Sequence, residues 1–288
     1  MNKPPEYLTT KEVADLLRLK ERKVYDLAAD EVIPCTRATG KLLFSRAAVD
    51  RWLLENSNRA ESNLQTPLMV GSHDPLLEWA VRESQCGIAT LFDGSSDGLE
   101  KFAAQQATVS AIHLYSHEAQ CWNVPQIEDQ FSGTSCVLIN WVYRQRGLVM
   151  PHSVKANQIE DLKNLTIAGR QPGAGSQILL ESLLQDAGLT INDTSTSVTV
   201  RSESDAVLAV VEGAAQCTLG LQSLAVQHQL DFVPLIEEPL DLLVNRRFWF
   251  DPSMQRFINF CQSDVFTERV DKLSGYRIDQ PLSVRFNG

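Results

Sequence analysis

The pattern of apolar and polar positions opens with two short helices. Thr9 and Glu12 have the spacing of a capping box, which satisfies the free N–H groups at a helix start. Apolar residues then recur at helical spacing over 9–17 and, after a break at 18–20, over 21–29. The apolar positions are Val13, Leu16, Leu17, Val24, Leu27 and Ala28. Two short helices joined by a tight turn predict a helix-turn-helix.

A hairpin and a third helix follow. Residues 32–35 and 42–44 predict two short strands, and the polar stretch 36–41 between them predicts the tip of a wing. Ser45 is placed to cap a third helix. The apolar positions that would close a small core from this helix are Ala48, Val49, Trp52 and Leu53.

These pieces together carry a resemblance. The stretches LTTKEVADLL, KVYDLA, VIP and LLFSRAAVDRWL, in this order within residues 7–55, resemble the winged helix-turn-helix of excisionases and MerR-type regulators. The resemblance implies that the second helix enters a DNA major groove while the wing reaches the backbone or the neighbouring minor groove. The candidate DNA contacts are Lys20, Arg22, Lys23, Tyr25, Arg37 and Lys41. The alternative is that these charges form a merely solvated helix face, which Glu21 and Asp26 share.

The segment 57–66 is polar and lacks apolar periodicity, which predicts a linker. We therefore expect a DNA-binding domain over 1–56 and a second domain over 67–288. Beyond the linker, short apolar runs at 68–70, 88–92, 109–114 and 165–168 are each followed by a polar turn or helical periodicity. This alternation predicts an α/β domain with a mostly parallel sheet.

Three of the strand-to-helix turns are rich in glycine and serine: GSHD, GSSDG and GAGS. Glycine lets the backbone approach a ligand closely, and serine at a helix start offers a hydroxyl beside free N–H groups. Several such turns at the carboxyl ends of neighbouring strands would form an anion-binding cleft. The alternative interpretation is that each turn is only a helix cap.

The same stretches carry a second resemblance. The segments GSHDPLLEWA, GSSDGLEKFA, AIHLYSHEAQCWNVP, RQRGLVMP, GRQPGAGSQILLESLL, VVEGAAQCTLGLQSLA and LDFVPLIEEPLDLLV resemble the periplasmic-binding-protein-like (PBP-like, type II) domain of bacterial regulators. That family is similar to the periplasmic molybdate- and tungstate-binding proteins. The resemblance implies two lobes, a hinge and a ligand in the cleft between the lobes.

Position by position, the resemblance implies roles for Ser72, Ser95, His113, Arg144, Arg146 and Arg170. The last turn departs from the family pattern: Ala174, Ser176 and Gln177 replace Ser, Thr and Arg, and Glu203 stands where the family often has His. The candidate ligand contacts are Ser72, Ser95, Ser96, His113, Arg170, Gly173, Gly175, Ser176 and Arg201.

Two binding modes for the effector stay open. Serine hydroxyls and backbone N–H groups can hold a tetrahedral dianion such as molybdate or tungstate without a full counter-charge. Arg170 or Arg201 would instead suit the bidentate binding of a phosphate or carboxylate on a larger molecule.

Composition and charge narrow the class of protein. The chain has 288 residues, 43% hydrophobic and 22% charged, typical of a folded globular protein. Its formal net charge is −10, yet the first 60 residues carry 11 Lys and Arg against 9 Asp and Glu, which fits two domains with different partners. The six cysteines are widely spaced, and we expect them to be reduced. Acidic pairs such as Glu237 and Glu238 are expected to be solvated.

We expect a non-enzymatic, cytoplasmic transcription regulator, without a cofactor, metal or membrane segment. Its expected partners are a double-stranded DNA operator, a small anionic effector and a second copy of the chain in a homodimer or higher oligomer. The alternative is a molybdate or molybdenum-cofactor-precursor carrier whose N-terminal module binds a protein.

Overall fold

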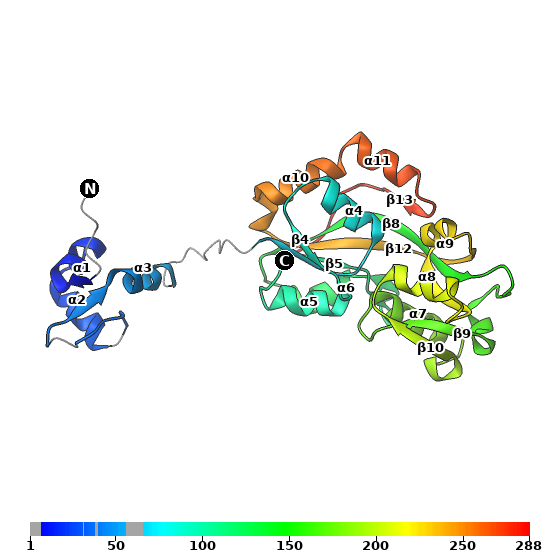
Figure 1. Ribbon diagram of the computed structural model, residues 1–288, viewed down its shortest axis with the longest axis horizontal. Helices are drawn as coiled ribbons and strands as arrows, with labels where there is room; N and C mark the ends of the chain where they lie inside the picture. Colours follow the sequence, from blue (N-terminus) through cyan, green and yellow to red (C-terminus); the bar gives the residue numbers. More distant parts are fainter. Residues whose placement is uncertain (1–6, 31, 38–39, 56–65) are drawn as a thin grey trace. The chain divides into compact units, whose positions relative to one another are not determined.

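A computed structural model describes residues 7–30, 32–37, 40–55 and 66–288. The chain divides into two compact units, Met1–Gln65 and Thr66–Gly288 (Figure 1). The linker predicted at 57–66 lies, apart from Thr66, outside the described residues. Residues 38 and 39 at the tip of the predicted wing also lie outside them.

The first unit is a helix-turn-helix with a short two-stranded sheet. Its elements are β1 (Tyr7–Thr9), α1 (Thr10–Leu17), α2 (Glu21–Ala29), β2 (Leu43–Ser45) and α3 (Arg46–Glu55). The predicted capping box is present: Thr9 Oγ1 accepts the Glu12 N–H at 3.3 Å, and the Glu12 carboxylate accepts the Thr9 N–H at 2.7 Å. Arg18 adopts the left-handed conformation with φ 55° and ends α1. The predicted break between the two helices is therefore confirmed.

One cluster of apolar side chains holds this unit together. Its buried members are Leu8, Val13, Ala14, Val24, Ala28, Ile33, Phe44 and Val49. The prediction that Leu53 joins the core is wrong, because it keeps 37% of its surface exposed, as does Leu16 of α1. A unit of about 50 residues has too little interior to bury every apolar position of three helices.

The second unit is an α/β domain. Its strands are β3 (Leu68–Gly71), β4 (Ala89–Leu91), β5 (Val109–Ile112), β6 (Tyr115–Ser116), β7 (Cys121–Trp122), β8 (Cys136–Met150), β9 (Thr166–Arg170), β10 (Ser195–Val200), β11 (Cys217–Leu221), β12 (Asp231–Asn245), β13 (Tyr276–Arg277) and β14 (Val284–Asn287). Its α-helices are α4 (Pro75–Glu83), α5 (Ser95–Ala103), α6 (Val124–Phe131), α7 (Gly175–Asp186), α8 (Glu203–Val211), α9 (Gln222–Gln227), α10 (Pro252–Cys261) and α11 (Asp264–Asp271). Short 3₁₀ helices span Ile159–Asn164, Ile191–Asp193 and Phe248–Phe250.

Two long strands join the two lobes of this domain. The main sheet runs in the order β10-β9-β11-β8-β12-β5-β3-β4. The strands of the first lobe (β3, β4, β5) are parallel to one another, and so are those of the second lobe (β9, β10, β11). The strands β8 and β12 pass through both lobes and pair antiparallel with each other and with their neighbours. The prediction of a mostly parallel sheet is therefore wrong for its centre.

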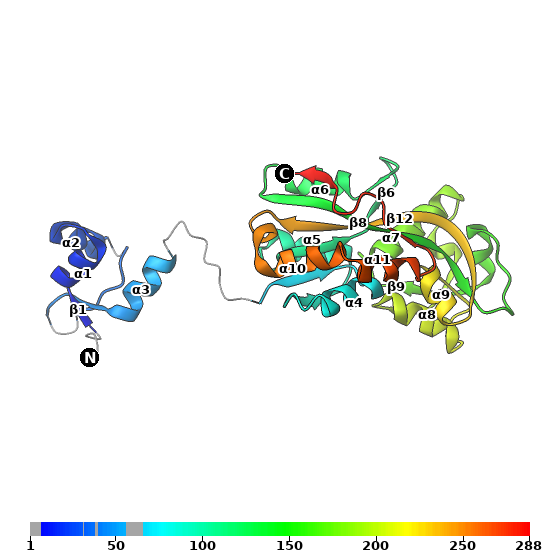
Figure 2. The ribbon, with the colours of Figure 1, turned by 90° about the horizontal axis from the view of Figure 1, so that it is seen from above.

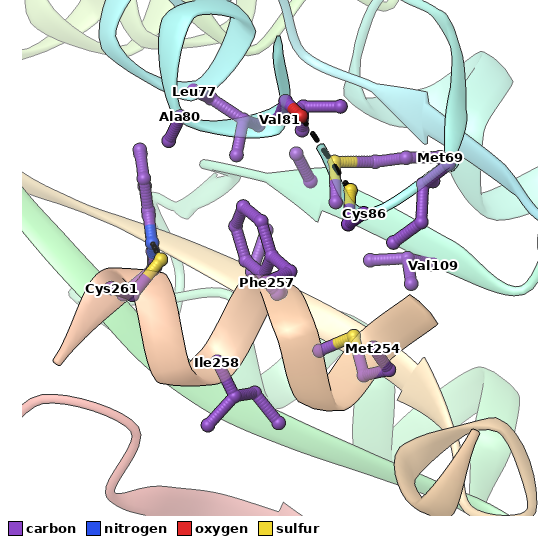
Figure 3. Close-up of a cluster of buried hydrophobic side chains, with 14 of the residues drawn as sticks. Met69, Leu77, Ala80, Val81, Cys86, Val109, Met254, Phe257, Ile258 and Cys261 are labelled. Atoms are coloured by element: carbon purple, nitrogen blue, oxygen red, sulfur yellow. Dashed lines mark hydrogen bonds between the residues drawn. The ribbon is translucent and has the colours of Figure 1, made fainter. Parts of the chain in front are cut away.

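Helices cover both faces of the sheet in the first lobe (Figures 1 and 2). Side chains alternate along a strand, so Ile139 packs with α4, α10 and α11, whereas its neighbour Leu138 packs with α5 and α6. Figure 3 shows part of the cluster that contains Ile139, with Met254 and Phe257 of α10 on one side and Leu77 and Val81 of α4 on the other. In the second lobe, α7 covers one face, and α8 and α9 pack on the other.

The contact between α5 and β3 leaves no room for a side chain at Gly98. A Cβ atom added there would lie 2.4 Å from Gly71 Cα and 2.6 Å from Ser110 Oγ. We predict that Gly98→Ala lowers the free energy of unfolding by about 1–3 kcal/mol, because overpacking outweighs the ~1 kcal/mol gain in helix propensity. Urea unfolding checks this, with Glu100→Ala at an exposed position of α5 as the control. An unchanged or higher urea concentration at the unfolding midpoint of Gly98→Ala would contradict the claim that α5 packs against β3 without room for a side chain.

Candidate functional site

The basic positions predicted to contact DNA all lie on the surface of the first unit. The helix α2 buries Val24 and Ala28 and turns Arg22, Lys23 and Tyr25 outward, with Tyr25 54% exposed. Lys20 precedes the helix, and Arg37 and Lys41 lie just beyond a single antiparallel bridge between Thr36 and Leu43; all three side chains are exposed. The predicted strand over 32–35 is wrong, because β2 pairs with β1 instead. The geometry thus presents a solvent-facing helix with cations at its N-terminal end.

The predicted ligand contacts lie where parallel strands of the second unit end. Ser72 and His113 follow β3 and β5 in the first lobe, and Arg170 ends β9 in the second. Ser95 and Ser96 open α5, and Gly175 and Ser176 open α7. The carboxyl ends of the strands and the N-termini of two helices thus meet where the two lobes are in contact, which is the edge at which open α/β sheets bind ligands.

In the first lobe, the hydroxyl groups of Ser72 and Ser95 are 2.5 Å apart and both side chains are buried. The His113 N–H donates to Ser95 Oγ at 3.3 Å. The imidazole Nδ1 of His113 lies 3.0 Å from Glu238 Oε2, which fixes the orientation of the ring. Three residues predicted from the sequence therefore lie together and are hydrogen-bonded to one another.

The second lobe closes directly onto this point. The Ser96 N–H donates to the Gly173 carbonyl oxygen at 3.1 Å. A Cβ atom on Gly175 would lie 2.3 Å from the His113 carbonyl oxygen, so only glycine allows this approach. Arg170 Nη1 lies 3.4 Å from Ser176 Oγ. The glycines of the GAGS turn serve the contact between the lobes.

Arg201 does not enter this buried group. Its side chain is 73% exposed and Nη1 forms an ion pair with Asp93 Oδ1 at 2.6 Å. Its carbonyl oxygen accepts a hydrogen bond from Arg170 Nη2 at 2.6 Å. Arg201 therefore joins the two lobes at the surface.

Sequence reasoning missed the main feature of the cleft, a buried cluster of alternating charges. Arg144 and Arg146 lie two residues apart on β8, so both point to the same face and reach Glu238 on β12. The expectation that Glu238 is solvated is wrong: it is fully buried, whereas Glu237 stays exposed and pairs with Arg277. The missed signal was charge complementarity between two strands, since Glu238 and Arg144 are register partners.

The cluster reaches into both lobes. On one side, Arg144 Nη1 binds Asp74 Oδ2 at 2.9 Å, and the Tyr276 hydroxyl donates to the same oxygen at 2.6 Å. On the other side, Glu203 at the start of α8 binds Arg146 and Arg170. Three guanidinium groups thus face three carboxylates, and the cluster carries no net formal charge.

Pairing keeps these groups ionised despite their burial. Burial alone would raise the pKa of Glu203, but the charges of Arg146 and Arg170 outweigh it and hold that pKa well below the ordinary value. The pKa of Glu238 is likewise lowered, because Arg144 and Arg146 overcome the effect of burial. Burial lowers the pKa of His113 below 6.5, with help from the nearby arginines and against the attraction of Glu238. His113 is therefore neutral at pH 7.

A small hollow adjoins the crevice beside Ser96. Its volume is about 200 Å³, and it is lined by Ser96, Leu99, Glu100, Leu114, Tyr115, Gln126, Gln130 and Ile178. Among the residues that the structure describes, no group of three His, Cys, Asp or Glu side chains is arranged to hold a metal ion. Within the same ranges, no helix has both the length and the apolar character needed to span a membrane.

The neutral state of His113 gives a pH-dependent stability. As the pH falls below about 6.5, His113 becomes protonated in the unfolded chain but stays neutral in the folded protein. The free energy of unfolding therefore decreases. We predict that His113→Gln removes this component, and that the gap in unfolding free energy between wild type and variant narrows from pH 7.5 to pH 5.5. Urea unfolding across this range measures the gap, with the exposed His152→Gln as the control. If the unfolding free energies of wild type and His113→Gln change equally with pH, His113 is not held neutral by the fold.

Comparison with known proteins supports both units. A helix-turn-helix domain model matches residues 7–57, and the PBP superfamily domain model matches residues 78–262. An uncharacterized protein of Bacillus subtilis (strain 168), YvgK, is 24% identical over 299 residues and covers 96% of both chains.

Solved structures share the fold of the second unit. A putative phosphate ABC transporter substrate-binding protein with bound phosphate from Clostridium perfringens matches 74% of this chain and 99% of its own, with 11% identity and a TM-score of 0.56. An H₂O₂-bound mutant of OxyR from Corynebacterium glutamicum matches 91% of this chain and 89% of its own, with 15% identity and a TM-score of 0.50. The N-terminal domain thus points to DNA binding and the two-lobed domain to binding of a small ligand. Since the match over residues 78–262 spans more than half of the sequence, the chain belongs to the PBP superfamily domain family and carries an N-terminal helix-turn-helix.

Proposed function

We propose that this protein is a one-component transcription regulator. Its N-terminal domain binds an operator in double-stranded DNA, and the cleft of its C-terminal domain binds a small oxyanion that changes the affinity for DNA. The two bindings are coupled reciprocally, so the operator changes the affinity for the anion by the same factor. One N-terminal domain can make only a few phosphate contacts. We therefore expect a homodimer whose two N-terminal domains bind two half-sites of the operator.

One observation supports an oxyanion above other ligands. The Ser72 and Ser95 hydroxyls and the His113 N–H lie together and, within the described part of the chain, bond only to one another, so an anion could replace those neutral bonds, whereas the three arginines beside them are already neutralised by carboxylates. Hydroxyl and N–H donors can hold a tetrahedral anion without a counter-charge. The bidentate alternative loses support, because Arg170 is engaged by Glu203 and Arg201 by Asp93. Molybdate and tungstate are the first anions to test, with phosphate and sulfate beside them.

The DNA-binding half of the proposal predicts a change in salt dependence. Arg22→Ala with Lys23→Ala removes two exposed cations from α2 without touching its buried face. The double variant should bind operator DNA more weakly and with a flatter dependence of affinity on salt, because fewer counterions are released. Gel shifts on the upstream region of the protein's own operon, at several salt concentrations, measure both quantities.

Lys272→Ala, at an exposed position of the C-terminal domain, is the matched control for that experiment. If the double variant keeps the wild-type affinity for DNA and the wild-type dependence of that affinity on salt, α2 is not the DNA interface. If the wild type itself binds no DNA, the N-terminal domain is better treated as a protein-interaction module.

The ligand-binding half predicts losses at three serines. Ser72→Ala, Ser95→Ala and Ser176→Ala each remove a donor to a charged group. Each should cost about 1.5–3 kcal/mol of anion binding, or roughly tenfold to more than a hundredfold in affinity. A thermal-shift screen of oxyanions identifies the ligand, because an anion that binds the native state raises its stability. Calorimetric titration of the three variants then tests each hydroxyl.

Ser182→Ala is the control for these variants, because Ser182 Oγ already donates to the Ile178 carbonyl within α7. Wild-type affinity in all three cleft variants would mean that these serines only cap helices and pack the lobes together. If no oxyanion stabilises the wild type, the sensing half of the proposal fails.

A further inference from the structure

The carboxylate of Glu203 is held in the way that a receptor holds a bound anion. It is the first residue of α8, and only 1% of its surface is exposed. Arg146 grips both oxygens, with Nη1 2.9 Å from Oε2 and Nη2 3.2 Å from Oε1. Arg170 Nη1 adds a third contact, 2.7 Å from Oε1. Such paired, charge-assisted bonds are the arrangement by which proteins recognise free carboxylates.

The surroundings place Glu203 within the crevice. Its partner Arg170 also reaches Ser176 Oγ, on the turn that closes onto His113. The second partner, Arg146, has every N–H group occupied: by Glu203, by Glu238 and by the Leu219 carbonyl. With Glu203 in position, Arg146 can offer nothing to a ligand, and the only unpartnered nitrogen of Arg170 is Nε.

We propose that Glu203 is an internal anion that sets the specificity of the cleft: its carboxylate occupies the place between Arg146 and Arg170 that a free carboxylate would take. This inference rests on the proposed function of the cleft as an anion site. The wild-type cleft then rejects carboxylate ligands, both by occupancy and by repulsion, and leaves an oxyanion to be held by hydroxyl and N–H donors.

Removing the Glu203 side chain should convert the specificity. The variant Glu203→Ala leaves a vacant space of carboxylate size between two buried guanidinium groups that have lost one counter-charge. Formate fits that space and restores the charge balance. Glu203→Gln is the matched isostere, because it loses the charge but leaves the space filled. Glu212→Ala removes an exposed carboxylate at the other end of α8 and serves as the control for general charge effects.

The experiment is calorimetric titration of the four full-length proteins with sodium formate at constant ionic strength. We expect Glu203→Ala to bind formate at one site, at least about tenfold more tightly than wild type, Glu203→Gln or Glu212→Ala. Formate should also raise the melting temperature of Glu203→Ala but not that of wild type. Equal formate binding by wild type, or none by Glu203→Ala, overturns the proposal.

A second measurement separates specificity from a merely structural ion pair. With the oxyanion found for the wild type, Glu203→Gln should bind that anion more tightly than wild type does, because a repelling charge is gone. A structural role predicts equal or weaker binding, and that result counts against the proposal. If the wild type binds no oxyanion, the proposed function fails, while the formate titration still decides the role of Glu203.

Folding of the variant is itself informative, because Glu203→Ala leaves Arg170 without its carboxylate and Arg146 with Glu238 alone, and a buried charge that loses its partner is costly. Glu203→Ala and the smaller change Glu203→Ser are therefore expressed with and without formate. If Glu203→Ala is recovered folded only with formate, the inference is supported. If neither variant is recovered under either condition, formate cannot replace the side chain and the proposal is rejected.

Discussion

The pairing of Arg144 and Arg146 with Glu238 across β8 and β12 is the interaction on which the two-lobed domain depends. All three groups are fully buried on the strands that join the lobes. A buried ion pair adds little net stability, because desolvation offsets the attraction, but removing one partner leaves a bare charge at a cost of about 3–5 kcal/mol. The domain can therefore bury these strands only if Asp74 from the first lobe and Glu203 from the second complete the cluster.

This constraint also determines the chemistry of the crevice. Because each guanidinium already faces a carboxylate, the cleft has no surplus of positive charge. Under the proposed function, an anion would then have to be held by the small groups beside it, namely the hydroxyls of Ser72 and Ser95 and the N–H of His113. The glycine turn at 173–175 acts at the same place, because it lets the second lobe come within contact distance of His113.

The local features of this protein could be predicted from its sequence, and the long-range ones could not. The capping box at Thr9 and the strand-to-helix turns at Ser72 and Ser95 depend on neighbours a few residues away, so their spacing carries the signal. The antiparallel course of β8 and β12 gave no local sign, because a buried strand looks alike in either direction. Glu238 was misjudged for a related reason. Its partners Arg144 and Arg146 are more than 90 residues away in the chain, and an acidic pair seen alone looks solvated.

The reach of the charge cluster along the chain has a consequence for synthesis. The Tyr276 hydroxyl bonds to Asp74 across 202 positions, so this hydrogen bond to the cluster forms only when nearly the whole polypeptide has left the ribosome. The first unit needs only contacts among residues 7–55, and it can fold while the rest is still being made. During translation the first unit can thus be complete long before the second unit. A chain cut short before β13 would carry a complete first unit and a second unit in which Asp74 keeps Arg144 but lacks the hydrogen bond from Tyr276, and such incompletely packed domains are substrates for quality-control proteases.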